Sequence, residues 1–255
     1  KIMKTVMITG ASSGIGREFA RAYARKGYRL ILCARREDRL KELAEEVKTE
    51  SILLTADLSR EEECYDLLNK VRDEDIDIFI NNAGFGTAGE FLDTDLNKEI
   101  TMVKVNDIAM QILMKGMLQK MQKRGGGTVL NVASSAGLFP AGPYMATYYA
   151  SKAYILSLTR AVARELKEKK SPVYLCALCP GPVDTEFNQN ADVIFAIKGI
   201  SAEQCVSECL SAMEKKKTVI VPSALMKTVT SLRKVLPDHI MIKYTGKQQK
   251  RKIWK

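Results

Sequence analysis

Seven short runs of apolar residues recur along the first 222 residues, and longer stretches with helical spacing separate them. Most runs are apolar on successive positions, which is typical of strands covered on both faces. They predict strands at residues 3–9, 28–34, 52–56, 76–81, 128–133, 173–179 and 218–221. The stretches between them predict helices near residues 14–26, 37–50, 60–72, 97–124, 147–170 and 202–216. This alternation predicts an α/β protein with a parallel sheet of about seven strands and helices on both faces.

No repeat, linker or change of composition divides the chain before about residue 214, so we expect a single domain. Residues 1–222 would form its body. Residues 223–255 would extend the same domain, because apolar residues at helical spacing predict an amphipathic helix over 223–236 that Pro237 ends. A basic tail follows that helix.

The composition is that of a globular protein. Of the 255 residues, 46% are hydrophobic and 27% charged, which excludes disordered, collagen-like and disulfide-rich classes. Six cysteines in a chain that opens directly on an apolar strand, with no secretory leader, indicate reduced thiols and a cytoplasmic protein. The longest charge-free stretch, residues 125–151, contains glycines, polar residues and two prolines, so we do not expect it to span a membrane.

The net charge of +10 is concentrated at one end of the chain. The last 42 residues hold 12 Lys or Arg and two acidic residues, and the body before them holds 28 of each sign. A nucleic-acid-binding protein would be basic throughout its binding domain, so we expect no nucleic acid partner. Three interpretations of the basic tail itself stay open: packing on the body or a sister subunit, weak contact with an anionic membrane surface, or binding of a nucleic acid or an acidic partner.

A glycine-rich turn follows the first predicted strand. Gly10, Gly14 and Gly16 are spaced G-x-x-x-G-x-G, and the next helix begins within the same turn. A backbone without side chains can approach a pyrophosphate closely, and a helix N-terminus offers free N–H groups and a positive dipole. The turn therefore indicates a dinucleotide site, with a purely structural turn as the alternative.

The second predicted strand ends at Arg35 and Arg36, where an acidic residue would instead bind the ribose 2′-hydroxyl of NAD. Two guanidinium groups suit a 2′-phosphate, which they can bind in bidentate fashion. We therefore favour NADP(H) over NAD(H) as the cofactor. In the alternative, both arginines face only solvent or the neighbouring Glu37 and Asp38.

Tyr148 and Lys152 are four residues apart at the start of a predicted helix, so their side chains share one face. An ammonium about 4 Å from a phenol, at an effective dielectric of about 20, is worth roughly 4 kcal/mol. That energy would lower the pKa of the phenol by about three units and make Tyr148 an acid and base near neutral pH. The neighbouring Tyr149 lacks such a partner, because Ala153 stands four residues after it.

Six motifs in a fixed order carry a resemblance to a known family. They are the turn at residues 9–16, the Asn-Asn-Ala-Gly run at 81–84, Asn106, the serine pair at 134–135, Tyr148 with Lys152, and residues 180–185. Over about residues 3–222 the chain resembles the short-chain dehydrogenase/reductase family, and residues 145–154 and 179–187 are similar to its general bacterial oxidoreductases. The resemblance implies a single-domain, doubly wound Rossmann fold whose NADP(H)-binding catalytic body is residues 1–222.

The resemblance also implies roles for individual residues. Tyr148 looks like the proton donor and acceptor, Lys152 would also bind the nicotinamide ribose, and Asn106 resembles the asparagine that holds a water of the proton relay. Cofactor contacts are implied at Gly10, Ser12, Ser13, Gly14, Ile15, Gly16, Arg35, Arg36, Asp57, Leu58, Asn82, Ala83, Gly84, Tyr148, Lys152, Pro180, Gly181, Val183 and Thr185. No metal site is expected, since a C-x-x-C spacing on a strand points its two thiols to opposite faces.

Two serines compete for the catalytic position. The register of the strand at 128–133 places Ser134 in the family position, whereas the commoner separation of thirteen residues before the tyrosine favours Ser135. We choose Ser134, because loops accept insertions more readily than strands accept slips in register.

These features together predict an oxidoreductase that transfers a hydride between NADP(H) and a carbonyl or alcohol substrate. By the resemblance, residues 188–198 fall in the variable substrate loop, and their four large apolar residues indicate an apolar substrate. In the alternative, this segment packs on the body as a lid without contacting the substrate. Two alternatives are a non-catalytic NADP(H)-binding regulatory module and a membrane-surface reductase of steroid or 3-oxoacyl substrates. The family resemblance also implies a homodimer or homotetramer. The helically spaced Met110, Met114, Met117 and Met121 would pack either in the core or at a subunit interface.

Overall fold

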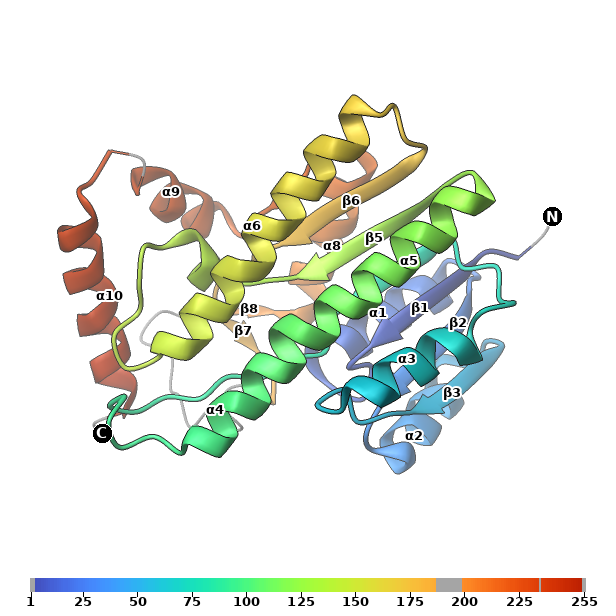
Figure 1. Cartoon of the computed structure of the whole chain (residues 1–255), viewed down its shortest axis with the longest axis horizontal. Coiled ribbons are helices and arrows are strands. Elements are labelled where there is room, and N and C mark those ends of the chain that lie inside the picture. The colour runs from blue at the N-terminus through green and yellow to red at the C-terminus, as the bar shows by residue number, and fades with distance from the viewer. Residues whose placement is uncertain (1–2, 187–198, 234, 254–255) are drawn as a thin grey trace.

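The computed structural model describes residues 3–186, 199–233 and 235–253, and the side chains of those residues as far as 250. Its centre is a seven-stranded parallel sheet in the order β3-β2-β1-β4-β5-β6-β9 (Figure 1). The strands are β1 (Thr5–Thr9), β2 (Arg29–Ala34), β3 (Ser51–Thr55), β4 (Ile78–Asn81), β5 (Gly127–Val132), β6 (Val173–Leu178) and β9 (Val219–Ile220). The strand order reverses between β1 and β4, and in a doubly wound sheet this point leaves a crevice at the carboxyl ends of the strands.

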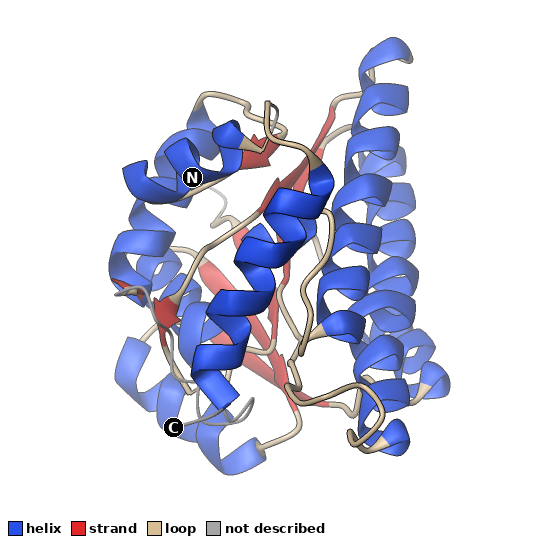
Figure 2. Cartoon of the chain, turned by 90° about the vertical axis from the view of Figure 1, so that its left-hand side faces the viewer, coloured by secondary structure: helices blue, strands red, loops and turns tan. Residues whose placement is uncertain are grey.

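Helices cover both faces of the sheet, as Figure 2 shows in a view along its edge. One face carries α1 (Gly14–Arg25), α2 (Glu37–Val47) and α8 (Ala202–Glu214), whose apolar residues share a cluster with β1 and β2. The other face carries α3 (Glu61–Lys70), α5 (Met110–Arg124) and α6 (Ala146–Glu168), which share a second cluster with β4 and β5. The expected doubly wound Rossmann fold with seven parallel strands is confirmed.

The long helix expected at residues 97–124 is interrupted. The structure has α4 (Leu96–Val103), a π-helical turn η1 (Lys104–Ala109) and then α5. A π-helical turn inside an α-helix inserts one extra residue and turns the following side chains, and such turns are common at functional sites. The hydrophobic spacing of this stretch stays helical throughout, so the sequence pattern does not reveal the interruption.

The C-terminal extension differs from the expectation. The helix predicted over 223–236 is the shorter α9 (Ala224–Leu232). A further helix, α10 (Asp238–Ile253), lies in the stretch for which the sequence predicts a basic tail. Residues buried on α10 are Met241, Thr245, Gly246 and Gln249. Only one of these four is a large apolar residue, so hydrophobic periodicity does not identify the helix. The division of the domain at residue 222 stays a prediction.

Smaller elements complete the site region. A turn of 3₁₀ helix, η2 (Ser135–Leu138), follows β5, and β7 (Val183–Asp184) pairs with β8 (Ile200–Ser201) in a second small parallel sheet. The expected substrate segment 188–198 lies outside the described residues. Of the two interpretations of the methionines on α5, the structure favours the core, because all four are buried against the sheet.

Candidate active site

A cavity of about 590 Å³ lies at the carboxyl ends of β1, β4, β5 and β6. Residues one or two positions after these strands line it: Gly10, Asn82, Ser134 and Pro180. The cavity therefore sits where the reversal of strand order predicts a binding crevice. Of the site residues expected from the sequence, Gly16 and Asn106 stand behind the wall, and the others line the cavity.

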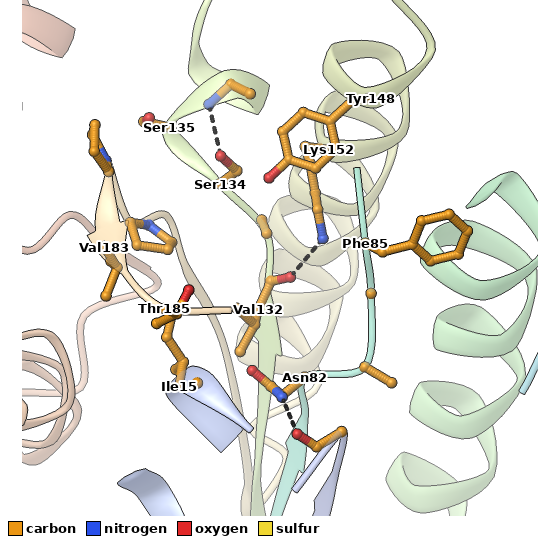
Figure 3. A pocket seen from close by; sticks show the side chains of 18 of the residues that line it. Ile15, Asn82, Phe85, Val132, Ser134, Ser135, Tyr148, Lys152, Val183 and Thr185 are labelled. Atoms are coloured by element: carbon orange, nitrogen blue, oxygen red, sulfur yellow. Dashed lines mark hydrogen bonds between the residues drawn. The ribbon is translucent and has the colours of Figure 1, made fainter. Parts of the chain in front are cut away.

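The glycine turn is shaped by close backbone contacts. Gly10 has a positive φ of 65°, and a Cβ added there would lie 2.9 Å from Cα of Ala83. At Gly14 φ is 53°, and an added Cβ would lie 3.3 Å from the Thr185 side chain, which lies beside Ile15 of the same turn (Figure 3). No acidic residue occupies the first turn of α1, which begins at Gly14. The bare turn and positive helix end fit a dinucleotide pyrophosphate.

Asn82 locks the glycine turn to the end of β4. Its side-chain amide donates hydrogen bonds to the carbonyl oxygens of Thr9, at 3.0 Å, and Gly10, at 3.2 Å (Figure 3). The backbone N–H groups of Asn82 and Ala83 donate to the Thr9 hydroxyl in return. These bonds cross between two neighbouring strands, so they fix the turn in the shape that the pyrophosphate needs.

Arg35 and Arg36 are exposed at the rim of the cavity. Arg36 reaches back over the glycine turn: its Nη2 lies 3.4 Å from the Ser12 hydroxyl and 3.0 Å from a carboxylate oxygen of Glu186. Asp57 and the buried Leu58 form the adjacent wall, and the Asp57 carboxylate accepts a hydrogen bond from the backbone of Ser59 at 3.0 Å. This rim offers a cation and an acidic group to whatever binds beside the turn.

At the other end of the cavity, η2 and α6 bring three polar side chains together. Tyr148 and Lys152 lie on the first turns of α6 and are both buried, and the Ser134 hydroxyl shares a hydrogen bond with the Tyr148 phenol. Lys152 Nζ lies 5.8 Å from the centroid of the Tyr148 ring. Figure 3 shows the three side chains converging from the two elements.

Ser135 does not join this group. Its backbone N–H donates to the carbonyl of Pro180, and its side chain lies on the far side of Ser134 from the phenol (Figure 3). The Ser134 hydroxyl also accepts a hydrogen bond from the N–H of Ala136 at 3.1 Å, which fixes its orientation at the start of η2. The geometry thus favours Ser134 over Ser135 as the serine beside the tyrosine.

Comparison with known families agrees with this arrangement. Residues 4–193 match the model of the family described as short chain dehydrogenase. The chain belongs to the short-chain dehydrogenase family. Membership of this family means that the chain is an oxidoreductase and that its cavity binds a nicotinamide dinucleotide.

Relatives of this short-chain dehydrogenase include a D-β-hydroxybutyrate dehydrogenase of Rhizobium meliloti, 32% identical over 86% of this chain and 87% of the relative. Among solved structures, a short-chain dehydrogenase from Sphingobium yanoikuyae in complex with NADPH is 28% identical with a TM-score of 0.82. It covers 91% of this chain and 94% of that one.

A bulky-bulky ketone specific alcohol dehydrogenase from Comamonas testosteroni is also 28% identical, with a TM-score of 0.78 over 92% of each chain. A structure from Burkholderia phymatum in complex with NAD is 23% identical, covers 91% of this chain and 93% of that one, and shares the fold with a TM-score of 0.83. Both nicotinamide cofactors therefore occur among its structural neighbours.

The electrostatics of the dehydrogenase site differ from the sequence expectation. Burial raises the pKa of Tyr148 to about 12, and the hydrogen bond from Ser134 offsets only part of that rise. Lys152 Nζ donates to the Val132 carbonyl at 3.2 Å (Figure 3), and burial lowers the pKa of Lys152 to about 8. The expected lowering of the Tyr148 pKa by Lys152 is absent in this arrangement, because the ammonium is directed at a carbonyl oxygen and is itself poorly solvated.

Asn106 lies in η1, fully buried behind the cavity wall. Its amide accepts from the Phe85 N–H at 3.1 Å and donates to the Phe85 carbonyl and the Ser151 hydroxyl. A Cβ added at Gly84 would lie 2.9 Å from Asn106 Oδ1 and 3.3 Å from Lys152 Nζ, so only glycine leaves these two groups close to the backbone there. Asn106 therefore positions the segment that faces Lys152.

Sequence reasoning missed Asp107, the next residue of the π-helical turn. Its carboxylate is buried, its Oδ1 has no hydrogen-bond partner among the described residues, and its charge interacts with that of Lys152. Burial raises the pKa of Asp107 to about 7, against the weaker lowering effect of Lys152. The π-helical turn brings this acid to the lysine, so the one-dimensional pattern carries no signal for it.

The sequence also missed the wall that α9 and α10 add to the cavity. Met226 and Val229 of α9 and Tyr244, Thr245, Gln248 and Gln249 of α10 all line it. With Phe85, Phe139 and Met145 they make the half of the cavity beyond Tyr148 largely apolar. We call this the substrate half and the part at the glycine turn the nucleotide half.

Two further observations concern the described residues as a whole. No group of three or more Cys, His, Asp and Glu side chains in them is arranged to hold a metal ion. Within the same residues, no helix is both long and apolar enough to cross a membrane. The six cysteines are all buried and unpaired by disulfides.

Proposed function

We propose that this short-chain dehydrogenase reduces bulky ketones, or oxidises the corresponding secondary alcohols, with NADP(H) as its cofactor and Tyr148 as its acid and base. One observation carries the proposal. Tyr148 and Ser134, joined by a hydrogen bond, stand beside the buried Lys152 between a nucleotide half and a largely apolar substrate half of one cavity.

The residues of the nucleotide half fit the dinucleotide. The bare turn at residues 10–16 and the N-terminus of α1 would hold the pyrophosphate, and Lys152 would hold the nicotinamide ribose. Arg36, with Arg35 beside it on the rim, would bind a 2′-phosphate, which supports NADP(H) as the preferred cofactor. The bound nicotinamide supplies or accepts the hydride.

The residues beside the substrate half would handle the proton. The Ser134 hydroxyl donates a hydrogen bond to the carbonyl oxygen, where negative charge develops during reduction. The Tyr148 phenol gives its proton to the same oxygen, and it takes the proton back when an alcohol is oxidised. Burial raises the pKa of Tyr148 to about 12, so in this arrangement the phenol holds the proton that reduction requires. Asn106 holds the Phe85 segment against this group.

The walls support a large apolar substrate. Phe85, Phe139, Met145, Met226 and Val229 present aromatic rings, thioethers and a branched side chain to the substrate half. Such walls bind a ligand by removing apolar surface from water. The Comamonas testosteroni structure is that of an enzyme specific for bulky-bulky ketones, which also supports this substrate class.

The proposal is tested by titrating the protein with NADPH and NADH, and then assaying a panel of bulky ketones at the absorbance of the reduced nicotinamide. We expect tighter binding of NADPH and turnover that the Tyr148→Phe variant loses. Binding of neither nucleotide would contradict the cofactor assignment. Equal turnover by wild type and Tyr148→Phe would contradict the acid and base assignment.

The exposed surface of the C-terminal helices favours a second candidate, a reductase working at an anionic membrane surface. Exposed apolar side chains there are Leu225, Leu232, Val235, Leu236, Ile240 and Tyr244. Basic side chains, including Lys227 and Lys243, stand among them. This combination binds the interface of anionic lipids.

The membrane candidate is tested by sedimentation with vesicles of mixed neutral and anionic phospholipid. A Val235→Asp, Leu236→Asp double variant is preferable to deletion of the extension, because deletion removes walls of the cavity. Co-sedimentation of the wild type at low salt, and its loss in the variant, would support the candidate. Equal sedimentation of both forms would contradict it.

A homodimer or homotetramer and a cytoplasmic location stay predictions. The exposed apolar side chains of Leu96, Ile100, Ile108 and Tyr154 on α4, η1 and α6 support the oligomer, because a second copy would cover them. Sedimentation equilibrium of the wild type and of an Ile108→Asp, Tyr154→Asp variant tests it.

A further inference from the structure

The far end of the substrate half carries a polar pair that the reaction does not use. Gln249 of α10 and Tyr149 of α6 are both buried and both line the cavity. Gln249 Nε2 donates a hydrogen bond to the Tyr149 hydroxyl at 2.6 Å, across 100 residues of sequence. Their position is held from both sides. Gly142 lies against the Tyr149 ring with no room for a side chain, and the Thr245 hydroxyl, one helical turn before Gln249, donates to the Ala141 carbonyl at 2.8 Å.

The pair has unused hydrogen-bonding capacity. Gln249 is 4% exposed, and its Oε1 finds no partner among the described residues. The Tyr149 oxygen accepts from Gln249, so its own hydrogen stays available for donation. A buried amide oxygen left without a partner destabilises the folded protein. In a wall made mostly of apolar side chains, such a group indicates a ligand contact.

The free capacity specifies the chemistry of the ligand. Two hydrogen-bonding groups of the pair are unused: the acceptor Gln249 Oε1, which lies just beneath the cavity surface, and the donor hydroxyl of Tyr149. Turning the amide by half a rotation exchanges the two roles and again leaves one donor and one acceptor. A single hydroxyl group on the ligand can pair with both the acceptor and the donor, because it donates one hydrogen bond and accepts others. None of the described residues that line the substrate half is charged, so a carboxylate or phosphate would find no counter-charge there.

We infer that Gln249 and Tyr149 form a specificity site for a hydroxyl group on the substrate, remote from the carbonyl that is reduced. The substrate class is then a hydroxylated bulky ketone. Its carbonyl meets Ser134 and Tyr148, and its apolar body lies against Phe139, Met226 and Val229. Its far hydroxyl bonds to the Gln249–Tyr149 pair. The inference rests on the proposed function, and it adds α10 as the element that selects the substrate.

Equilibrium binding to the protein loaded with NADP⁺ tests the inference without relying on turnover. The probes are three matched pairs of ketones: indanone, tetralone and androstanone, each compared with a derivative that carries one hydroxyl on the ring farthest from the carbonyl. Calorimetric titration of the wild type should give a Kd about tenfold lower for the hydroxylated member of at least one pair. The Gln249→Met variant should bind both members of that pair equally.

Control variants separate the contact from general damage to α10. Gln249→Glu keeps an acceptor beside Tyr149 and should retain the preference. Lys250→Met makes a comparable change at the next residue, which is exposed, and should leave all six values unchanged. Tyr149→Phe should reduce the preference for the hydroxylated ketone. The double variant with Gln249→Met should differ little from Gln249→Met alone, because the two substitutions remove the same site.

Two results would overturn the inference: equal Kd values within every pair for the wild type, or a preference that persists in Gln249→Met. Reduction of the same ketones, followed in wild type and Tyr148→Phe, separates this outcome from the fate of the proposed function. Preferential binding without Tyr148-dependent reduction would support the Gln249 contact and contradict the proposed reaction. Tyr148-dependent reduction without preferential binding would support the proposed reaction and contradict the Gln249 contact.

Discussion

The two halves of the cavity are built in different ways. The nucleotide half consists mainly of backbone and small residues within a few positions of a strand end, and its contacts link neighbouring strands of one sheet. The substrate half consists of large side chains from α6, α9, α10 and the loops beside them, and two of its hydrogen bonds join residues 104 and 100 positions apart. The first arrangement is repeated in short motifs and marks the family. The second depends on how distant segments pack, and it determines what the enzyme selects.

The largest effect is expected where the two halves meet. Replacing Tyr148 by Phe removes the proton that the carbonyl oxygen needs, so ketone reduction should fall on the order of 10²–10⁴-fold, while NADPH affinity changes little. The measurement is kcat/KM, with NADPH binding followed separately. With a ketone that carries no hydroxyl group, Tyr149→Phe is the matched control, because the Tyr149 hydroxyl contacts Gln249 instead of the carbonyl, and the variant should retain most of the activity. A comparable loss in both variants would contradict the assignment.

The next effect distinguishes the adjacent serines. Ser134 shares a hydrogen bond with Tyr148, whereas Ser135 points away from it. Ser134→Ala should lower kcat by roughly 10²-fold, the usual cost of losing one donor to a developing oxyanion. Ser135→Ala, with the same chemical change one residue later, should stay close to wild type. A larger loss for Ser135→Ala would reverse the choice between the two.

A third variant tests the backbone character of the nucleotide half. At Gly10 a Cβ would meet the Ala83 backbone at 2.9 Å with φ at 65°, so Gly10→Ala should weaken NADPH binding by about tenfold or more and lower the melting temperature. Gly27→Ala is the control: φ is 76°, but nothing lies within 4 Å of the added Cβ. It should lose some stability and keep its NADPH affinity. Equal loss of affinity in both would show that strain alone accounts for the effect.

Cofactor preference should respond to the rim of the nucleotide half. Arg36→Ala should weaken binding of NADPH by about tenfold and leave that of NADH unchanged, because only NADPH has the 2′-phosphate. Glu186→Gln should act in the opposite direction, since Glu186 now pairs with Arg36 at 3.0 Å and would repel the phosphate. Fluorescence titration of both nucleotides measures this. A change of equal size for NADPH and NADH would rule out a 2′-phosphate contact.

The smallest effect concerns the pH dependence of stability at Asp107. The pKa of this carboxyl rises from 3.8 to about 7 on folding, so its contribution to stability is complete below 3.8 and is lost as pH rises through 7. Asp107→Asn does not titrate. The Asp107→Asn variant should therefore melt at a higher temperature than the wild type only as pH rises. Each kcal/mol of unfolding free energy that the wild type loses should lower its melting temperature by about 2–4 °C. The same advantage on the acid side of 3.8 would contradict this account.

Much of the nucleotide half could be predicted from the sequence, because each of its motifs lies next to the strand that positions it. The glycine turn, the Asn82 segment and Tyr148 with Lys152 all stand where the spacing predicts. Other features depend on contacts between distant residues. The π-helical turn that brings Asp107 to Lys152 keeps a helical hydrophobic pattern, and α10 buries Thr245, Gly246 and Gln249, which no hydrophobic period marks. The prediction that Lys152 lowers the pKa of Tyr148 was wrong. The spacing of the two residues does not show that the Lys152 ammonium donates its hydrogen bond to the Val132 carbonyl.

The central claim is that one cavity joins a nicotinamide dinucleotide site to Tyr148-dependent proton transfer on a ketone. A single-turnover experiment tests it most directly: stoichiometric NADPH and excess bulky ketone are mixed with wild type and with Tyr148→Phe, and oxidation of the nicotinamide is followed by absorbance. We predict one NADPH oxidised per chain in the wild type and a rate on the order of 10² or more lower in Tyr148→Phe, with equal NADPH binding. Equal rates in the two proteins would contradict the account.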